Sequence, residues 1–142
     1  MFKQAEIILS DEQNKAWLKY KNGENIFITG PGGSGKSELI RKIYKDAIMN
    51  GKVCNVTAMT GCAAMLLKCK GRTLHSWASI GLGIGDMDDI ATKIKRHKQK
   101  RENWTTTDIL IVDEVSMMSS NIFELLCVIA KRVRVNREKR LF

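Results

Sequence analysis

Hydrophobic and polar residues follow one another along the chain with two different periods. Some blocks place an apolar residue every three or four positions, the spacing of one helix face, whereas others are short unbroken apolar runs of strand length. The helical spacing predicts helices at about 11–21, 39–48, 61–68, 86–101 and 120–133, and the apolar runs predict strands at 26–29, 53–57 and 108–112. Strands that alternate with helices predict an α/β fold with a parallel sheet.

Local signals mark where several of these helices begin and end. Ser10 and Gln13 have the spacing of a capping box, in which each side chain accepts a hydrogen bond from a free backbone N–H. Gly23 and Gly51 follow the first two predicted helices, where glycine commonly ends a helix. The run at 108–112 is β-branched without alternation, as expected for a strand that helices cover on both faces.

The composition is that of one soluble domain. The chain has 142 residues, 44% hydrophobic and 27% charged, with a single proline, which excludes disordered, collagenous and disulfide-scaffold classes. Its longest uncharged apolar stretch, Leu125 to Ala130, is far short of the roughly 20 residues that span a bilayer. The four cysteines form no CxxC pair and lie at no metal-ligand spacing. We therefore expect an intracellular domain with reduced thiols and no membrane partner.

The net charge of +9 is concentrated in two segments. Residues 93–101 carry six Lys or Arg and no acid, and residues 131–140 carry six Lys or Arg and one Glu. Local basic segments suit a polyanion such as nucleic acid, but a solvated helix face or a basic loop explains the same pattern. The sequence leaves both interpretations open. The candidate nucleic-acid contacts of the first segment are Lys95, Arg96, Lys98 and Lys100.

A glycine-rich loop follows the first predicted strand and opens the second predicted helix. It fits the pattern GxxxxGK[ST] and consists of Gly30, Pro31, Gly32, Gly33, Ser34, Gly35, Lys36 and Ser37. Glycines in this context bring backbone N–H groups against phosphate oxygens at the positive end of a helix. We expect the loop to bind ATP, with Lys36 reaching the β- and γ-phosphates and Ser37 ligating Mg²⁺.

The same glycines also satisfy GxGxxG, the fingerprint of dinucleotide-binding folds. That fingerprint requires an acidic residue near the end of the second strand to hold a ribose. The second predicted strand runs instead into uncharged residues, and the fingerprint gives no role to Lys36 and Ser37. The phosphate-loop interpretation is therefore preferred.

Two adjacent carboxylates, Asp113 and Glu114, complete the predicted nucleotide site. They follow the strand at 108–112, and the carboxyl ends of parallel strands face the crevice where α/β folds bind ligands. A phosphate-loop NTPase needs an acid there to hold Mg²⁺ through water, a role that we assign to Asp113. Glu114 would orient and deprotonate the attacking water, which favours a hydrolase over a nucleotide kinase.

Five separated segments together resemble the petite-integration-frequency (PIF) family of superfamily 1B DNA helicases. In family order they are LSDEQNKAW, GPGGSGKS, TAMTGCAA, GRTLHSWASIGLG and ENWTTTDILIVDEVSMM, and they extend over about residues 8–142 together with the helix that follows. The resemblance implies a 5′-to-3′ ATP-dependent DNA helicase with a RecA-like motor domain. It also implies ATP and Mg²⁺ as cofactors, single-stranded DNA and duplex junctions as partners, and roles in DNA repair, recombination and telomere maintenance.

The resemblance further implies roles outside the phosphate loop. Gln13 resembles the glutamine that recognises adenine, and five other residues resemble segments that hold or adjoin single-stranded DNA: Thr60, Gly61, Thr73, His75 and Ser76. Small residues and hydroxyls suit close approach of a phosphodiester backbone. Simpler roles stay open, with Gln13 as a capping partner and His75 as a partly buried, hydrogen-bonded histidine. Trp77 and Trp104 are interpreted as packing residues.

Compared with the family, the sequence lacks several parts. These are the glutamine-bearing sensor motif, the second RecA-like domain and the arginines that reach ATP from across the cleft. Three strands are predicted where the fold has five or six. We therefore expect residues 1–142 to form an incomplete RecA-like domain that binds Mg-ATP but turns it over poorly, with a second polypeptide as the candidate source of the missing motor domain. The alternative is an accessory protein that binds nucleotide and single-stranded nucleic acid without hydrolysis. A small phosphate-loop kinase fits the length but leaves Glu114 unexplained.

Overall fold

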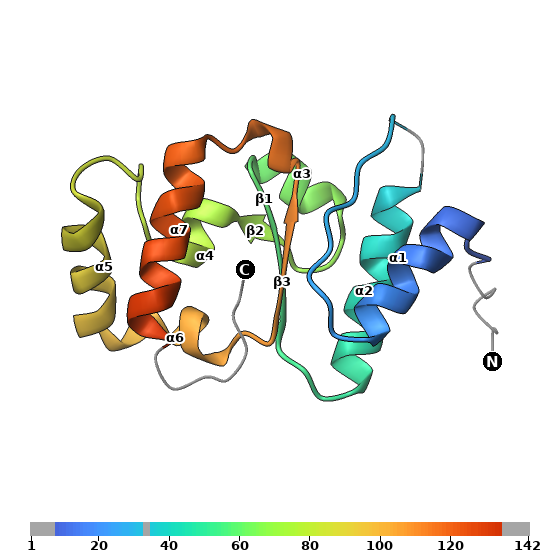
Figure 1. Ribbon diagram of the computed structural model, residues 1–142, viewed down its shortest axis with the longest axis horizontal. Helices are drawn as coiled ribbons and strands as arrows, with labels where there is room; N and C mark the ends of the chain where they lie inside the picture. The colour runs from blue at the N-terminus through green and yellow to red at the C-terminus, as the bar shows by residue number, and fades with distance from the viewer. Residues whose placement is uncertain (1–7, 33–34, 135–142) are drawn as a thin grey trace.

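The computed structural model of the chain describes residues 8–32 and 35–134 (Figure 1). The helices are α1 (Asp11–Lys21), α2 (Lys36–Met49), α3 (Gly61–Leu66), α4 (Leu74–Ala78), α5 (Met87–Arg96), α6 (Lys98–Thr106) and α7 (Ser120–Val133), with a short 3₁₀ helix, η1 (Val115–Met117). The strands are β1 (Cys54–Ala58), β2 (Arg72–Thr73) and β3 (Ile109–Asp113). The predicted helices that correspond to α1, α2, α3 and α7 are confirmed, as are the predicted strands that correspond to β1 and β3.

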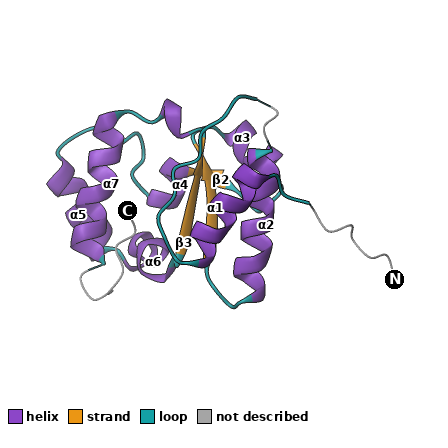
Figure 2. Cartoon of the chain, turned by 45° about the vertical axis from the view of Figure 1, so that its right-hand side comes forward, coloured by secondary structure: helices purple, strands orange, loops and turns teal. Residues whose placement is uncertain are grey.

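The three strands form one parallel sheet in the order β2-β1-β3. β1 pairs with β3 from Cys54 opposite Ile109 to Ala58 opposite Asp113, whereas β2 pairs only with the last two residues of β1. All three strands therefore end at one edge, which we call the carboxyl edge; β1 and β3 begin at the opposite, amino edge. Figures 1 and 2 show α1 and α2 on one side of the sheet and α4 to α7 on the other. The predicted α/β fold with a parallel sheet is confirmed.

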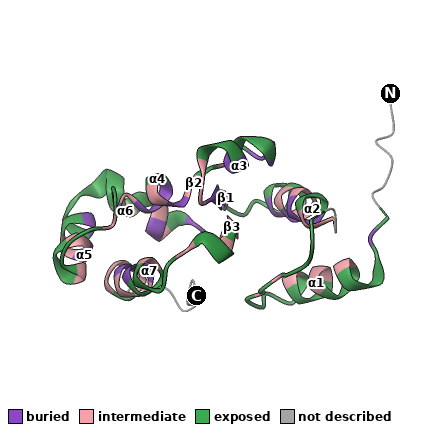
Figure 3. Cartoon of the chain, turned by 90° about the horizontal axis from the view of Figure 1, so that it is seen from above, coloured by how far each residue is buried: buried purple, intermediate pink, exposed green. Residues whose placement is uncertain are grey.

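Successive side chains of β3 point into different helical layers. Leu110 and Val112 pack against the core of α4 to α7, whereas Ile109 and Ile111 pack against the core on the α2 side. Seen from above, the sheet lies between these two layers (Figure 3). Because both faces are covered, β3 needs apolar residues at successive positions rather than at alternate ones.

A pair of tryptophans anchors the layer of α4 to α7. Trp77 of α4 and Trp104 of α6 are both fully buried, and their ring centroids lie 4.7 Å apart. Trp104 Nε1 donates to the carbonyl of Ala78 at 3.0 Å, and Asn103 Nδ2 donates to the carbonyl of Trp77 at 2.9 Å. The interpretation of both tryptophans as packing residues is confirmed.

Glycines end the first two helices as predicted. Gly23 and Gly51 have φ of 74° and 70°, a left-handed conformation that glycine adopts without a steric penalty. After α2, the Gly51 N–H donates to the carbonyl of Ile48 at 3.1 Å and the Lys52 N–H to that of Ala47 at 3.0 Å. These two bonds form a Schellman motif, which satisfies carbonyls at the end of the helix.

The predicted strand at 26–29 is wrong. Within the described residues, this segment makes no backbone hydrogen bond to β3 or to another strand, and Phe27 is 76% exposed. Ile28 instead packs against Leu39 and Ile43 of α2, so side-chain burial rather than strand pairing holds the segment. An apolar run predicts burial, but it does not specify a pairing partner. The third strand is β2, whose two residues are too few to form a recognisable run.

The predicted helix at 86–101 is two helices. Between α5 and α6, His97 has an extended backbone with φ −100° and ψ 110°. Ala91 and Ile94 are the buried residues of α5, and the chain after them is polar until Trp104. The turn at His97 brings Trp104 back to the core, which a straight continuation of α5 would not do. Helix α4 was not predicted, because five residues are too few to show a helical period.

The cysteines divide by exposure. Cys54 and Cys69 are buried, Cys127 is half-buried and Cys62 is exposed. Burial raises the pKa of the Cys54 thiol to about 12 and also raises that of Cys69.

No helix in the part of the chain that the structure describes is long and apolar enough to cross a membrane.

Candidate functional site

The glycine-rich loop reaches the carboxyl edge of the sheet, where α2 begins (Figure 1). Gly30, Pro31, Gly32 and Ser37 are exposed there, whereas Gly33 and Ser34 lie outside the described residues. Gly35 immediately precedes α2 and has a left-handed backbone with φ 86°. The first turn of α2 has backbone N–H groups without a partner inside the helix, and such a helix N-terminus favours an anion.

Lys36 closes the loop on itself. Its Nζ donates to the carbonyl of Gly30 and to the carbonyl of Pro31, the latter at 3.3 Å. Lys36 is half-buried as a residue, and its ammonium group lies beside the loop backbone without a carboxylate partner among the described residues. A phosphate oxygen could replace either carbonyl as its acceptor, because both are hydrogen-bond acceptors of the same ammonium.

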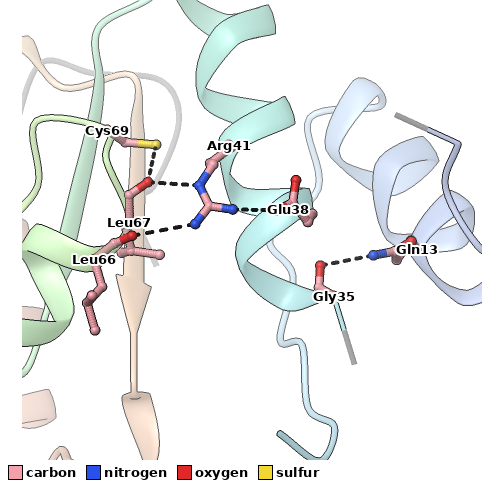
Figure 4. Close-up of polar contacts among 7 residues, drawn as sticks. All are labelled: Gln13, Gly35, Glu38, Arg41, Leu66, Leu67 and Cys69. Atoms are coloured by element: carbon pink, nitrogen blue, oxygen red, sulfur yellow. Dashed lines mark hydrogen bonds and ion pairs between the residues drawn. The ribbon is translucent and has the colours of Figure 1, made fainter. Parts of the chain in front are cut away.

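Gln13 joins the start of α1 to this loop. Its Oε1 accepts a hydrogen bond from the Ser10 N–H at 2.8 Å, and its own N–H donates to Ser10 Oγ at 3.3 Å, so the predicted capping box is confirmed. Its Nε2 also donates to the carbonyl of Gly35 at 2.9 Å (Figure 4). Both ends of the amide are used within the protein. The adenine contact that the resemblance implied stays a prediction.

Arg41 is a positioning residue that the sequence analysis did not single out. Its guanidinium donates to the carbonyls of Leu67 at 3.2 Å and Leu66 at 3.5 Å, and it forms an ion pair with Glu38 at 2.6 Å (Figure 4). Arg41 therefore fixes the end of α3 against α2. An arginine on a helix gives no signal in the sequence for so distant a backbone contact, because its partners lie about 25 residues away.

The two predicted acids lie at the end of β3. Asp113 is the last residue of the strand, opposite Ala58 of β1, and is half-buried. Glu114 follows with a left-handed backbone, φ 56° and ψ 38°, immediately before η1. That conformation is costly for a residue with a Cβ and is frequent at functional sites. It turns the chain sharply at the carboxyl edge.

Two of the candidate DNA residues cap short helices at this same edge. Thr60 Oγ1 accepts a hydrogen bond from the Ala63 N–H at 3.3 Å at the start of α3, and Thr73 Oγ1 accepts one from the Ser76 N–H at 3.2 Å at the start of α4. Thr60 Oγ1 also donates to Glu114 Oε2 at 3.5 Å. The threonines thus have a structural role, and Thr60 in addition contacts a predicted catalytic acid.

The remaining candidate DNA residues divide between the two edges. Gly61 and Ser76 are exposed and His75 is half-buried, near the threonines described above. The four basic candidates Lys95, Arg96, Lys98 and Lys100 lie instead around the junction of α5 and α6, toward the amino edge (Figure 1). Of the second basic segment, residues 135–140 lie outside the described residues. Among the described residues, the structure therefore does not join Lys95, Arg96, Lys98 and Lys100 to the loop and the acids.

Within the described residues, no group of three or more His, Cys, Asp or Glu side chains could hold a metal ion. The predicted Mg²⁺ ligands are a different set, the hydroxyl of Ser37 in the first turn of α2 and the carboxylate of Asp113. Both are oxygen donors, as Mg²⁺ prefers, and two protein ligands leave room for phosphate oxygens and water. The residues present fit the ion as part of a nucleotide complex.

The comparisons with known proteins all point to the same family. A sequence profile described as PIF1-like helicase matches residues 8–142. The chain is 40% identical over 134 residues to the ATP-dependent DNA helicase PIF1 of Saccharomyces cerevisiae, covering 93% of this chain and 15% of that protein. It therefore spans only a small part of the length of this relative.

The solved structures that are similar to this chain belong to the same family. The crystal structure of the Pif1 helicase from Candida albicans superposes with a TM-score of 0.83 at 42% identity, covering 92% of this chain and 30% of that one. A second structure, which concerns DNA unwinding at forked double-stranded DNA by two coordinating Pif1 helicases, gives a TM-score of 0.68 at 28% identity over 95% of this chain. The predicted RecA-like class and the resemblance stated from the motifs are both confirmed.

Proposed function

Because this chain belongs to the PIF1-like helicase family, we propose that it forms the ATP-binding part of the first RecA-like motor domain of a 5′-to-3′ DNA helicase. The observation that carries the proposal is the convergence of the phosphate loop, the acids of β3 and Thr60 at the carboxyl edge. Relatives of this family are ATP-dependent DNA helicases. Genome maintenance at single strands and duplex junctions is the corresponding biological role.

The nucleotide would be held by residues from three elements. The loop N–H groups and Lys36 suit the phosphates, and Gln13, which donates to the carbonyl of Gly35, is the proposed contact to the base. Ser37 and Asp113 suit Mg²⁺, which neutralises phosphate charge when bound. Gln13 would have to give up its bond to Gly35 to reach adenine, so nucleotide binding would change the contact between α1 and the loop.

Glu114 is proposed as the general base. Its carboxylate would take a proton from the water whose oxygen attacks the γ-phosphorus, and the bond to the β-phosphate oxygen would break to release ADP and phosphate. Asp113 ends β3, whereas Glu114 follows it with a left-handed backbone at the start of η1. Each acid can then serve a different role.

Thr60 offers a route by which DNA could affect hydrolysis. The same hydroxyl is a candidate contact for single-stranded DNA and a hydrogen-bond donor to Glu114 at 3.5 Å. A phosphate oxygen that accepted the Thr60 hydroxyl would remove this weak bond from Glu114 and leave the carboxylate free to accept a proton from water. DNA binding would therefore stimulate turnover.

The test is nucleotide binding and hydrolysis by the purified chain, with and without single-stranded DNA, beside Lys36→Ala and Glu114→Gln. We expect a fluorescent ATP analogue to bind the parent chain and Glu114→Gln alike, and Lys36→Ala at least about tenfold more weakly. Turnover should be slow, because an arginine supplied from another domain typically contributes about 10³ to 10⁵ in rate. A second polypeptide that carries this arginine should accelerate it.

Two results would contradict the proposal. Unchanged affinity of Lys36→Ala for the analogue would remove the loop from the nucleotide site. Fast turnover that survives Glu114→Gln would assign the base to another residue. Tight ATP binding with no hydrolysis, even after a second motor domain is added, would instead support the accessory-protein alternative.

A further inference from the structure

A cluster of positive charge lies away from the proposed motor site. It consists of the exposed side chains at the end of α5 and the start of α6, namely Lys93, Lys95, Arg96, Lys98 and Lys100, which we call the amino-edge basic surface. α6 leads into β3 at the amino edge, where the Asp108 N–H donates to the Val53 carbonyl at 2.9 Å. The carboxyl edge is one five-residue strand away, roughly 13 Å. Figure 1 shows α6 and η1 at opposite ends of β3.

These five cations have no carboxylate partner among the described residues, and residues 93–101 contain no acid. Elsewhere in the same part of the chain, ion pairs do form: Lys21 with Asp46, Arg41 with Glu38, and Arg132 of α7 with Asp88 of α5. Clustered like charges repel one another and destabilise the folded state. A bound polyanion would remove that repulsion.

The charges are also placed where they are unfavourable for the helix. The first turn of α6 contains Lys98 and Lys100 and no acid, and no side chain caps it. A helix N-terminus favours negative charge, because the backbone dipoles point their positive end there. By contrast, the first turn of α5 has Asp88 and Asp89, which follow the rule. The lysines of α6 therefore add to a positive field instead of cancelling it.

The surface lacks the features of a protein-docking site. Within the described residues, no large hydrophobic side chain is exposed between Ile84 and Met117, and Trp104 is fully buried. Protein interfaces concentrate their binding energy in buried aromatic and apolar anchors, which are absent from this surface. Lys and Arg without apolar neighbours suit phosphate groups, whose recognition is mainly electrostatic.

The same absence favours a duplex over a single strand. Proteins that hold single strands stack bases on aromatic side chains, and no Phe, Tyr or Trp is exposed on this surface. A duplex needs no such platform and carries one negative charge per roughly 1.7 Å of its axis. We propose that the amino-edge basic surface binds the phosphate backbone of duplex DNA, separately from the carboxyl edge. The choice of DNA rests on the proposed helicase function, whereas the charge argument does not.

The test compares two matched variants, each of which removes two positive charges. Lys98→Gln/Lys100→Gln alters the surface, and Lys15→Gln/Lys19→Gln alters exposed lysines on α1. Binding of a short blunt DNA duplex, and of a single strand of the same length, is measured by fluorescence anisotropy over a series of salt concentrations. We expect the surface variant to bind the duplex about tenfold more weakly and to lower the salt slope by about 2, with the control unchanged.

Further measurements distinguish loss of the duplex site from misfolding of the variant and from failure of the proposed function. The surface variant should melt at the same temperature as the parent chain or higher, since it relieves repulsion, and should bind the ATP analogue normally. Duplex affinity that is equal in both variants, or a preference for the single strand, would overturn the proposal. Tighter surface-dependent binding of polyglutamate than of the duplex would assign the surface to an acidic protein segment. The affinity of Lys36→Ala for the ATP analogue tests the proposed motor site independently of the amino-edge basic surface.

Discussion

Gln13 shows how one side chain can serve two structural roles. Its amide oxygen caps α1 through Ser10, and its amide nitrogen holds the carbonyl of Gly35. The carbonyl of Gly35 is accessible to it because Gly35 has no side chain, and a Cβ built there would lie 2.2 Å from Gln13 Nε2. Gly35 is therefore required both for its left-handed backbone and for close approach of Gln13.

Gly35→Ala is expected to destabilise the nucleotide-free chain by about 1–2 kcal/mol, because a Cβ is disfavoured at φ 86°. Gln13 can move its flexible end but would lose its hydrogen bond. Gly32→Ala is the control, since no atom lies within 4 Å of a Cβ at that position. Urea unfolding measures both, and equal stability of the two variants would contradict the role of Gly35.

Asp46 links α2 to α1 through charge. Tyr20 Oη donates to Asp46 Oδ2 at 2.8 Å, and Lys21 Nζ donates to both carboxylate oxygens at 3.2 Å. Burial acts to raise the pKa of Asp46, but these hydrogen bonds outweigh it and hold the pKa below its ordinary value of 3.8. Burial, reinforced by the bond to Asp46, raises the pKa of Tyr20.

The stability that Asp46 contributes should therefore depend on pH. Above pH 3.8 the Asp46 carboxylate is ionised in both the folded and the unfolded chain, and its hydrogen bonds stabilise the folded state. As the pH falls below 3.8, the unfolded chain takes up a proton first, and this stabilisation is lost. We expect Asp46→Asn to lower the free energy of unfolding by about 1 kcal/mol at neutral pH and by little near about pH 3. Urea unfolding from neutral pH to about pH 3 measures this, and a difference that does not shrink toward acid would contradict it.

At the scale of elements, the layer of α4 to α6 depends on its tryptophan pair. Trp104→Phe removes the hydrogen bond to Ala78 and leaves space beside Trp77, and we expect it to cost about 2 kcal/mol in the free energy of unfolding. Trp17→Phe is the matched control, because Trp17 is only half-buried on α1. Its cost should stay below about 1 kcal/mol. A larger effect at Trp17 would show that the α1 side carries more of the stability.

The unpaired segment at 26–29 gives a prediction for hydrogen exchange. Amides of Ile26 to Thr29 should exchange quickly, since no described backbone acceptor protects them, whereas those of Val56 and Ile111 should be among the slowest. Native-state hydrogen exchange with fragment analysis measures both. Slow exchange at 26–29 would mean that the segment pairs with β3 in solution.

These elements show which features local sequence determines. The caps of α1 and α2 were predicted because their signals, a serine with a glutamine and a glycine, lie within four residues of the helix ends. The absence of pairing at 26–29 was not predictable, because an apolar run indicates burial but not a pairing partner, and β2 was not predictable because two residues form no recognisable run. The break at His97 was missed for a related reason: the position of Trp104 depends on Trp77, which belongs to α4.

For the whole molecule, the sheet separates two surfaces of different chemistry. The acids Asp113 and Glu114 lie at the carboxyl edge because they follow a strand, a rule that sequence alone can apply, whereas the loop precedes α2 without a strand before it. The distance of the basic segment from them, and the contact between Thr60 and Glu114, required the fold.

The exposure of Cys62 allows the two edges to be probed separately. We expect iodoacetamide to modify Cys62 first in the folded chain, because Cys54 and Cys69 are buried with raised pKa values. Single-stranded DNA should slow the reaction, since Cys62 adjoins Thr60 and Gly61, whereas duplex bound at the amino edge should not. Mass spectrometry of timed samples measures this, with the urea-unfolded chain as control. Equal protection by both DNAs would contradict two separate surfaces.

The pairing of β1 with β3 sets an order for synthesis on the ribosome. Thr57 and its hydrogen-bond partner Ile111 are 54 residues apart, whereas β1 meets β2 at Thr57 and Arg72. Closing a long loop costs entropy before its contacts form, so parallel pairing of this kind is intrinsically slow. A nascent chain can pair β1 with β2 early but must wait for the whole of α4 to α6 before β3 arrives. During that interval the backbone N–H and C=O groups of β1 that pair with β3 are open, and a chaperone or rapid formation of α5 and α6 would protect this edge from aggregation.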